Sequence, residues 1–393
     1  MDWVEVEASA GRRIDRAAAT RILHLAIEKS PASLALYERL GDALTAEGRF
    51  QEAIVAFRRR AAAEPELFKS WRALAQCHVE LGDLESALDV CNQGEQQGRS
   101  ADVARVRGET LEMLGRQGEA IVYLRQAFEA NPKDEFALES LLRCLSREPD
   151  AAPLLEFCDA LPATPFLQSR RLAFRAVALS RLGRVDEARA LVDVARHVMV
   201  FRFDPPSEHG DAVAFNARLA HWLIANTGSV PTPRPDCVID YGLTHTRLPL
   251  INELRSFVRR SFATYVAQLP VLGLGDLMPL PPAGELFDFV VFLHGNGRNG
   301  EHVHPNAYVV GVYYVQVPKD VQLASDMRGC LVLGACEKLT DGHQPAWGVR
   351  YLKPEPGMLV LFPAHMFHDV VPTQSAEPRI VIGADVRPAP RHA

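Results

Sequence analysis

The amino-acid sequence predicts an α+β protein of two domains: a solenoid of paired α-helices, then an antiparallel β-sandwich or barrel with flanking helices. Two observations predict this division. A repeat of 33–34 residues recurs in the first half of the 393-residue chain, and short strand-like runs dominate after residue 286. A chain of this length can bury two separate cores. We therefore expect a helical-repeat domain at residues 1–200 and a strand-rich domain at residues 201–393.

The composition excludes several classes of protein. A formal net charge of −6 argues against nonspecific nucleic-acid binding, which needs a basic surface. The seven cysteines are scattered and form no C-x-x-C pair, which is typical of free thiols in a reducing compartment. The sequence has no apolar run long enough to span a membrane and no signal-like stretch in its first residues. We expect a cytoplasmic protein that does not bind membranes.

Four segments of the first half share a G-x-x-x-x-A frame. They are GRFQEA (48–53), GDLESA (82–87), GRQGEA (115–120) and GRVDEA (183–188). Their glycines lie 34, 33 and 68 residues apart, and 68 is two periods of 34. A degenerate unit is therefore expected around residues 149–161. Fixed periods of this length are typical of repeat architectures.

Each unit has the pattern of a helical hairpin. Gly48 lies where the chain reverses, and Ala53 is small enough to let the second helix approach the first. Apolar residues recur at helical spacing on both helices, at Leu40, Leu44, Ile54 and Phe57. A single hairpin leaves an apolar face that only the next hairpin can cover, so the hairpins are expected to stack into a solenoid.

These residues resemble the tetratricopeptide repeat (TPR) family over roughly residues 30–200. The positions of one unit that fall on the family's motif are Tyr37, Leu40, Gly41, Gly48, Ala53, Phe57 and Pro65. The resemblance implies a concave surface for a peptide, a protein partner or the neighbouring domain. An equally weighted alternative is that the repeats only form a homodimer or brace the second domain.

The second half changes character. Two amphipathic helices are expected at residues 211–228 and 248–270. Five strand-like runs follow, at residues 286–294, 308–317, 329–334, 357–363 and 379–386. Because no helical segments separate these runs, an antiparallel sandwich or barrel is favoured over a doubly wound sheet.

The segment HGNGRNG contains a G-x-G-x-x-G pattern at Gly295, Gly297 and Gly300. A dinucleotide-binding turn must follow a strand and begin a helix, whose N-terminus holds the pyrophosphate. The following residues, EHVHPNAYVVGVYYV, are instead Pro-interrupted, β-branched and aromatic. The glycines therefore indicate a tight hairpin between two strands rather than a nucleotide site.

His302 and His304 are two residues apart, so on a strand both imidazoles face the same side. His368 follows the run at 357–363, and Arg379 begins the last strand. Two neighbouring histidines, a distant third and a basic residue beyond it suit a metal ion with an anionic ligand beside it. The other histidines His294, His343 and His365, and also Asp385, are expected to be structural, while Asp369 is a weaker carboxylate candidate.

The strand-rich half resembles the bacterial 2-oxoglutarate/Fe(II) oxygenases that often follow tetratricopeptide repeats. The resemblance rests on HVHPNAYVVGVYYVQVP (302–318), PEPGMLVLFPAHMFHDVVP (354–372) and RIVIGADV (379–386). It implies a double-stranded β-helix, or jelly roll. It also implies Fe(II) and O₂ with 2-oxoglutarate as co-substrate.

Carried over by position, the resemblance makes His302, His304 and His368 the metal-ligand candidates and Arg379 the 2-oxoglutarate anchor. Tyr313 and Tyr314 alternate on a strand, so one faces inward, and Tyr314 is a candidate for the co-substrate pocket. Two features depart from the family. His304 stands where an H-x-D/E triad has its carboxylate, so either it takes that place in a three-histidine site or only one of the pair is a ligand. Val381 replaces a frequent serine.

The sequence therefore predicts an Fe(II)- and 2-oxoglutarate-dependent dioxygenase that hydroxylates a C–H bond of a peptide, protein or small molecule. Two alternatives remain open. A cupin-like three-histidine metalloenzyme would not use 2-oxoglutarate and would not require Arg379. A non-catalytic repeat scaffold with a vestigial barrel would bind neither iron nor co-substrate.

Overall fold

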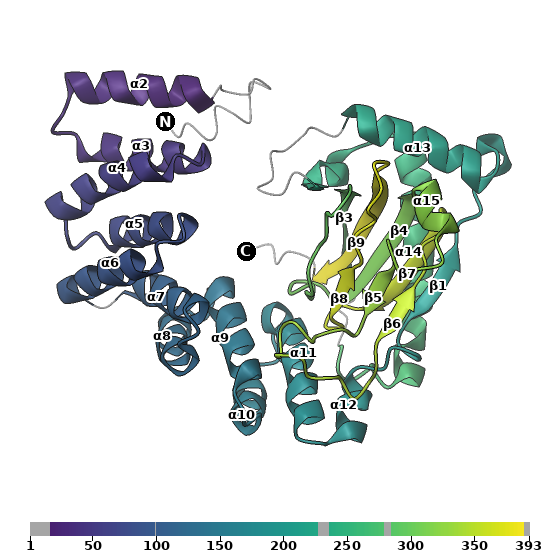
Figure 1. The fold of residues 1–393 in the computed structure, drawn as a ribbon. Coiled ribbons are helices and arrows are strands. Elements are labelled where there is room, and N and C mark those ends of the chain that lie inside the picture. Colours follow the sequence, from purple (N-terminus) through teal and green to yellow (C-terminus); the bar gives the residue numbers. More distant parts are fainter. Residues whose placement is uncertain (1–15, 99, 227–235, 279–283, 389–393) are drawn as a thin grey trace. The chain divides into compact units, whose positions relative to one another are not determined.

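The computed structural model describes residues 16–98, 100–226, 236–278 and 284–388 (Figure 1). The first residues, where the sequence indicates no signal peptide, lie outside these ranges. The chain divides into two compact units, residues 1–148 and 149–393. The mixed α+β class predicted from the sequence is confirmed, with helical repeats first and antiparallel sheets second.

The first unit consists of helical hairpins in the described residues. Its helices are α2 (Arg16–Lys29), α3 (Leu34–Ala46), α4 (Phe50–Ala63), α5 (Phe68–Glu80), α6 (Leu84–Gln97), α7 (Ala101–Met113), α8 (Gln117–Ala130) and α9 (Glu135–Arg147). The repeat glycines Gly48, Gly82 and Gly115 adopt φ angles of 75°, 74° and 74° between the paired helices. This left-handed conformation favours glycine, so the repeated position follows from the backbone of the turn.

Close packing explains a second repeated feature. A Cβ on Gly41 would lie 2.6 Å from the ring of Phe57, and a Cβ on Gly108 would lie 2.5 Å from Leu124. These glycines let a large side chain of the second helix of a hairpin lie against the backbone of the first. The stacking predicted from the apolar stripe is thus made by direct helix contact.

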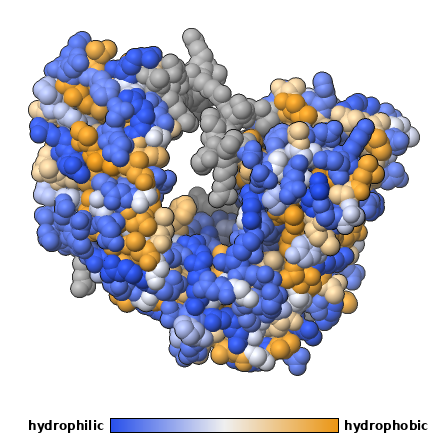
Figure 2. Space-filling view, in the orientation of Figure 1, coloured by the Kyte–Doolittle hydropathy of each residue, from blue (hydrophilic) through white to orange (hydrophobic). Residues whose placement is uncertain are grey.

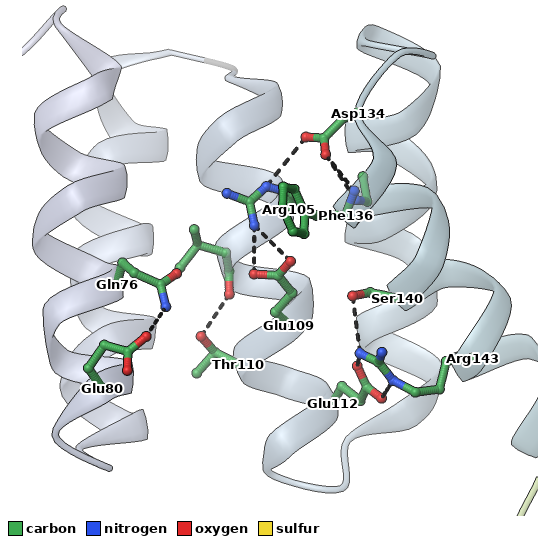
Figure 3. A network of polar contacts seen from close by, with 12 residues as sticks. Gln76, Glu80, Arg105, Glu109, Thr110, Glu112, Asp134, Phe136, Ser140 and Arg143 are labelled. Carbon is green, nitrogen blue, oxygen red and sulfur yellow. Dashed lines mark hydrogen bonds and ion pairs between the residues drawn. The ribbon is translucent and has the colours of Figure 1, made fainter. Parts of the chain in front are cut away.

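Polar contacts also join successive repeats (Figure 3). Arg105 of α7 pairs with Glu109 on its own helix at 2.7 Å and with Asp134 at 3.3 Å, just before α9. Glu112 of α7 accepts two hydrogen bonds of 2.6 Å from Arg143 of α9. Bidentate pairs of this kind fix the orientation of two helices as well as adding energy.

The second unit begins with three helices and continues into the strands. Its elements are α10 (Ala152–Ala160), α11 (Pro165–Arg181), α12 (Val185–Leu191), β1 (Met199–Arg202), η1 (Ser207–His209), α13 (Ala212–Asn226), β2 (Cys237–Asp240), η2 (Tyr241–His245), α14 (Pro249–Leu272), β3 (Gly284–Leu293), β4 (Val309–Gln316), α15 (Lys319–Leu323), β5 (Leu331–Leu333), β6 (Arg350–Leu352), β7 (Met358–Pro363), β8 (His368–Val370) and β9 (Arg379–Pro388). The two helices expected from the sequence correspond to α13 and α14.

The compact units divide earlier than the domain boundary expected after residue 200. Helices α10–α12 carry the last repeat motif, yet they pack within the strand-rich unit. Phe174 of α11 lies edge-to-face against Phe367, with ring centroids 5.4 Å apart. Ser169 of α11 donates a 2.7 Å hydrogen bond to the carbonyl of Ala307. A repeat motif predicts how the two helices of a hairpin pack against each other. It does not predict which element packs against the outer face of that hairpin.

The strands form two antiparallel sheets. One has the order β1-β7-β4-β9-β3-β2, and the other has the order β6-β5-β8. The five expected runs correspond to β3, β4, β5, β7 and β9, whereas β1, β2, β6 and β8 were not predicted. Each of these four is only 3 or 4 residues long, which is too short for a period of two to stand out.

Alternation assigns the two faces of the larger sheet. On β9, Ile380 and Ile382 belong to the apolar core formed with α13 and α14. Arg379, Val381 and Gly383 alternate with them in sequence and line a cavity on the other face. Successive side chains of a strand point to opposite faces, so one strand builds both the core and the cavity wall.

The glycine segment at 294–301 is not the hairpin that its sequence suggests. Strands β3 and β4 both pair with β9, which lies between them, so the segment crosses over rather than turning back. A glycine is needed at position 297 because a Cβ there would lie 1.9 Å from the carbonyl oxygen of Asp236. A strand follows the glycines and no helix, which agrees with the exclusion of a nucleotide-binding turn.

Hydrophilic residues cover much of the face seen in Figure 2, with hydrophobic ones interspersed. Among the helices of the described residues, none is long and apolar enough to cross a membrane.

Candidate metal centre

A backbone pairing brings His302 and His368 together. The two residues form an isolated antiparallel bridge, in which each backbone N–H donates to the other's carbonyl at 3.1 and 3.0 Å. The N–H of His304 then donates to the carbonyl of Ala364 at 3.0 Å. A segment with no strand of its own is thereby held beside β8, and the predicted same-face pair meets the distant histidine.

The three imidazoles form one cluster. Their ring nitrogens include one atom from each residue within 4.8 Å of the other two. The ring centroids of His302 and His368 are 4.1 Å apart, and that of His304 lies 5.3 and 5.0 Å from them. The structure therefore brings together all three histidines that the sequence selected as ligand candidates.

Hydrogen bonds hold each ring by the same atom, Nδ1. His302 Nδ1 lies 2.7 Å from the carbonyl of Gly300, and His368 Nδ1 lies 3.1 Å from the carbonyl of Met366. His304 Nδ1 lies 2.7 Å from Oδ1 of Asp385. Because a carbonyl or carboxylate oxygen only accepts, each Nδ1 carries the proton. In a neutral ring of this tautomer Nε2 is the unprotonated nitrogen, which is the form that binds a metal.

Burial keeps two of these rings neutral. Burial, followed by the neighbouring His304, lowers the pKa of His302 to about 4. Burial and the two neighbouring histidines hold the pKa of His368 well below its usual value. Neither ring needs to lose a proton at neutral pH before it can act as a ligand, so the donor set fits a divalent transition metal.

Arg379 lies in the same cavity as the three histidines. Its side chain is 1% exposed, and Tyr314 is its partner in a side-chain hydrogen bond and a cation–π contact. Nη2 donates to the Tyr314 hydroxyl at 3.4 Å, and the guanidinium lies 4.9 Å from the centre of the tyrosine ring. Nε has no hydrogen-bond partner in the part of the chain that the structure describes. A buried guanidinium without a carboxylate is costly unless an anion pairs with it.

The two tyrosines of β4 face opposite sides, as their alternation predicts. Tyr314 points to the cavity face and contacts Arg379. Tyr313 points to the helices and donates a 2.8 Å hydrogen bond to Asn216 of α13. Tyr314 is not among the residues that line the cavity, so it would act on a ligand through Arg379.

The cavity has a volume of about 50 Å³, which exceeds the space that one water needs. Its wall is mostly apolar, with Asn299 adding an amide. Phe289 of β3 lies directly opposite Gly383 of β9. A Cβ on Gly383 would be 2.3 Å from the Phe289 ring. Gly383 thus allows a phenylalanine to lie beside His304, with ring centroids 6.2 Å apart.

Asp385, which was expected to be structural, lies against the cluster through its hydrogen bond with His304. Burial by itself would raise the pKa of Asp385, but His304 and Arg387 outweigh it and lower the pKa. The carboxylate is therefore ionised where it accepts from His304. A signal for this was present, because Arg379, Val381, Gly383 and Asp385 follow a period of two along one face of β9.

The other titratable candidates lie outside the cluster. His365 Nε2 is 2.8 Å from the carbonyl of Leu191 on α12, and His343 Nε2 is 2.9 Å from the hydroxyl of Ser180. Asp369 pairs with Arg298 at 2.6 Å and with Lys338 at 3.0 Å. His365 and His343 thus connect loops to helices. Asp369, the weaker ligand candidate, is already paired with two cationic side chains.

Comparison with known sequence families agrees with both halves of the chain. Residues 44–109 and 106–134 match tetratricopeptide repeats. Residues 289–385, which contain the three histidines, Tyr314, Arg379 and Asp385, match the family described as "Putative 2OG-Fe(II) oxygenase". The chain thus combines tetratricopeptide repeats with a domain of this oxygenase family. A comparison with curated proteins found no match.

The solved structures that match part of this chain include two described as tetratricopeptide repeat proteins. YrrB, described as a TPR protein with an unusual peptide-binding site, is 18% identical with a TM-score of 0.36 and covers 44% of this chain and 93% of its own. A tetratricopeptide repeat protein from Parabacteroides merdae is 20% identical with a TM-score of 0.37, covering 45% and 71%. MamA is 20% identical with a TM-score of 0.36, covering 40% and 87%.

Proposed function

We propose that the strand-rich unit is an Fe(II)- and 2-oxoglutarate-dependent oxygenase. The observation that carries the proposal is one cavity with two kinds of group. Three imidazoles line it with their Nδ1 atoms hydrogen-bonded elsewhere, and a buried guanidinium with no carboxylate partner among the described residues lines the same cavity. A metal and a dianionic chelating ligand would satisfy both at once.

In this proposal His302, His304 and His368 hold the iron through Nε2. Their Nδ1 hydrogen bonds keep the rings oriented, so little rearrangement is needed when the ion binds. With 2-oxoglutarate and O₂, the bound iron supplies the oxidising power for hydroxylation of a C–H bond. The three ligands leave other coordination positions free for these molecules.

Arg379 would bind the 2-oxoglutarate carboxylate that lies away from the metal. The guanidinium is held against the face of Tyr314, which fixes its plane and leaves its other donors for the ligand. The apolar wall from Val291, Val312 and Val381 excludes water from around the pair, and this strengthens the charge-assisted contact.

The prime substrate is proposed to be a peptide, a protein or a small molecule. The repeats would serve as a surface for a peptide or protein partner, as repeats of this family generally do. Phe136 at the start of α9 is one exposed side chain that a partner could contact. It is 71% exposed and lies beside the guanidinium of Arg105. Homodimer formation through the same unit is the alternative.

Anaerobic reconstitution with Fe(II), followed by titration with 2-oxoglutarate, tests the proposal. We expect one iron per chain and a weak visible charge-transfer band that saturates with the co-substrate. Iron binding without such a band would favour a cupin-like three-histidine enzyme that does not use 2-oxoglutarate. Folded protein that binds no iron would favour a scaffold with a vestigial barrel.

A further inference from the structure

Asp385 differs from the other groups that hold the three imidazoles. His302 and His368 donate to neutral backbone carbonyls, whereas His304 donates to a carboxylate. Asp385 is 2% exposed, and its second oxygen accepts a 3.0 Å hydrogen bond from Arg387. Among the described residues, His304 is thus the one candidate ligand that is hydrogen-bonded to a negative charge.

We propose that Asp385 is a positioning residue that supplies the negative charge of the metal site through His304. The inference rests on the proposed metal binding. Three imidazoles are neutral and leave the charge of a divalent ion uncompensated. A carboxylate hydrogen-bonded to Nδ1 makes the other nitrogen a stronger donor and fixes the ring. In this arrangement the carboxylate does not bind the ion itself. Its negative charge acts on the ion through the ring of His304.

Arg387 partly compensates the negative charge of Asp385 and so weakens its effect on His304. It shares the carboxylate of Asp385, and its guanidinium lies 3.6 Å from the ring centre of Phe287, which holds it in place. Its cation competes with the imidazole for the carboxylate and adds a positive charge near the ion. Removal of Arg387 should therefore act in the opposite direction to removal of the Asp385 charge.

Co(II) binding to the full-length apoprotein tests the inference, because the visible spectrum of Co(II) reports its ligands. Asp385→Asn keeps an acceptor for His304 but removes the charge, and we expect the Co(II) dissociation constant to rise about 10–100-fold with a shifted spectrum. Arg387→Gln should tighten Co(II) binding. Asp369→Asn is the matched control, since this buried carboxylate adjoins His368 but binds Arg298 and Lys338.

The outcomes separate this inference from the proposed function. If the wild-type protein binds neither Co(II) nor Fe(II), the proposed function fails and the inference with it. If the wild type binds and Asp385→Asn binds equally well, the inference alone is overturned. An equal loss in Asp369→Asn would overturn it too, because the effect would then not pass through His304. Should Asp385→Asn fail to fold, unchanged or weaker binding by Arg387→Gln overturns the inference.

Discussion

Charged side chains are used differently in the two units. In the repeat unit, Arg105 and Arg143 pair with carboxylates of neighbouring turns and helices. In the strand-rich unit, Arg379 is buried with no carboxylate in the described residues, and three imidazoles face one another. Satisfied pairs join helices, whereas an unsatisfied buried group costs stability unless a ligand completes it. The contrast separates the structural charges of this chain from its candidate site.

The largest effect is expected on folding, when a fragment that begins at residue 149 is compared with one that begins at residue 201. A fragment of residues 149–393 should fold and bind metal, whereas a fragment of residues 201–393 should not fold. The shorter fragment lacks α11, whose Phe174 is fully buried and lies against Phe367, next to His368. Circular dichroism, thermal unfolding and metal stoichiometry of both fragments check this. Equal folding of the two would show that α11 and α12 are dispensable for the barrel.

The next largest effect is expected at the histidine cluster. Alanine at His302, His304 or His368 should remove most of the iron at neutral pH, because two ligands rarely hold the ion alone. His294→Ala is the control, since this histidine lies outside the cluster. Iron per chain after gel filtration is the measurement, with circular dichroism to confirm folding. Full iron in His304→Ala together with loss in His302→Ala would exclude His304 as a ligand.

Arg379 should affect the co-substrate and not the metal. Arg379→Met is expected to weaken 2-oxoglutarate binding by roughly 2–5 kcal/mol, or about 30-fold or more, because a buried charge-assisted contact is lost. Iron content should not change. Titration of the iron-loaded protein measures the affinity, and Arg143→Met in the repeat unit is the matched control. An unchanged dissociation constant would remove Arg379 from the site.

The smallest effect is expected in the repeat unit. Glu112→Gln should lower the free energy of unfolding of the full-length protein by about 1 kcal/mol, because its partners Arg143 and Arg147 are partly exposed and screened by water. Metal and 2-oxoglutarate affinities should stay at their wild-type values. Urea unfolding and the two titrations provide the test. Weakened co-substrate binding in this variant would mean that the two units are energetically coupled.

Much of the fold could be predicted from local patterns. The glycines at positions 48, 82 and 115 indicated the hairpin turns, because only a residue without Cβ adopts their φ angles readily. The strand-like runs at 286–294 and 379–386 correspond to β3 and β9, because β-branched and aromatic residues bounded by turn residues favour strands. The hairpin expected at Gly295–Gly300 was wrong, because pairing depends on β9, which comes some 80 residues later in the chain.

The sequence by itself determined the repeat, the strand periodicity and the shared face of His302 and His304, since these depend on neighbours within a few residues. The period of two along β9 also puts Arg379 and Asp385 on one face, although Asp385 was expected to be structural. Tertiary structure decided that His368 pairs with His302, that His304 meets Asp385, and that α11 belongs with the barrel. These contacts join segments far apart in the chain, and they form only when both sheets and their covering helices exclude water together.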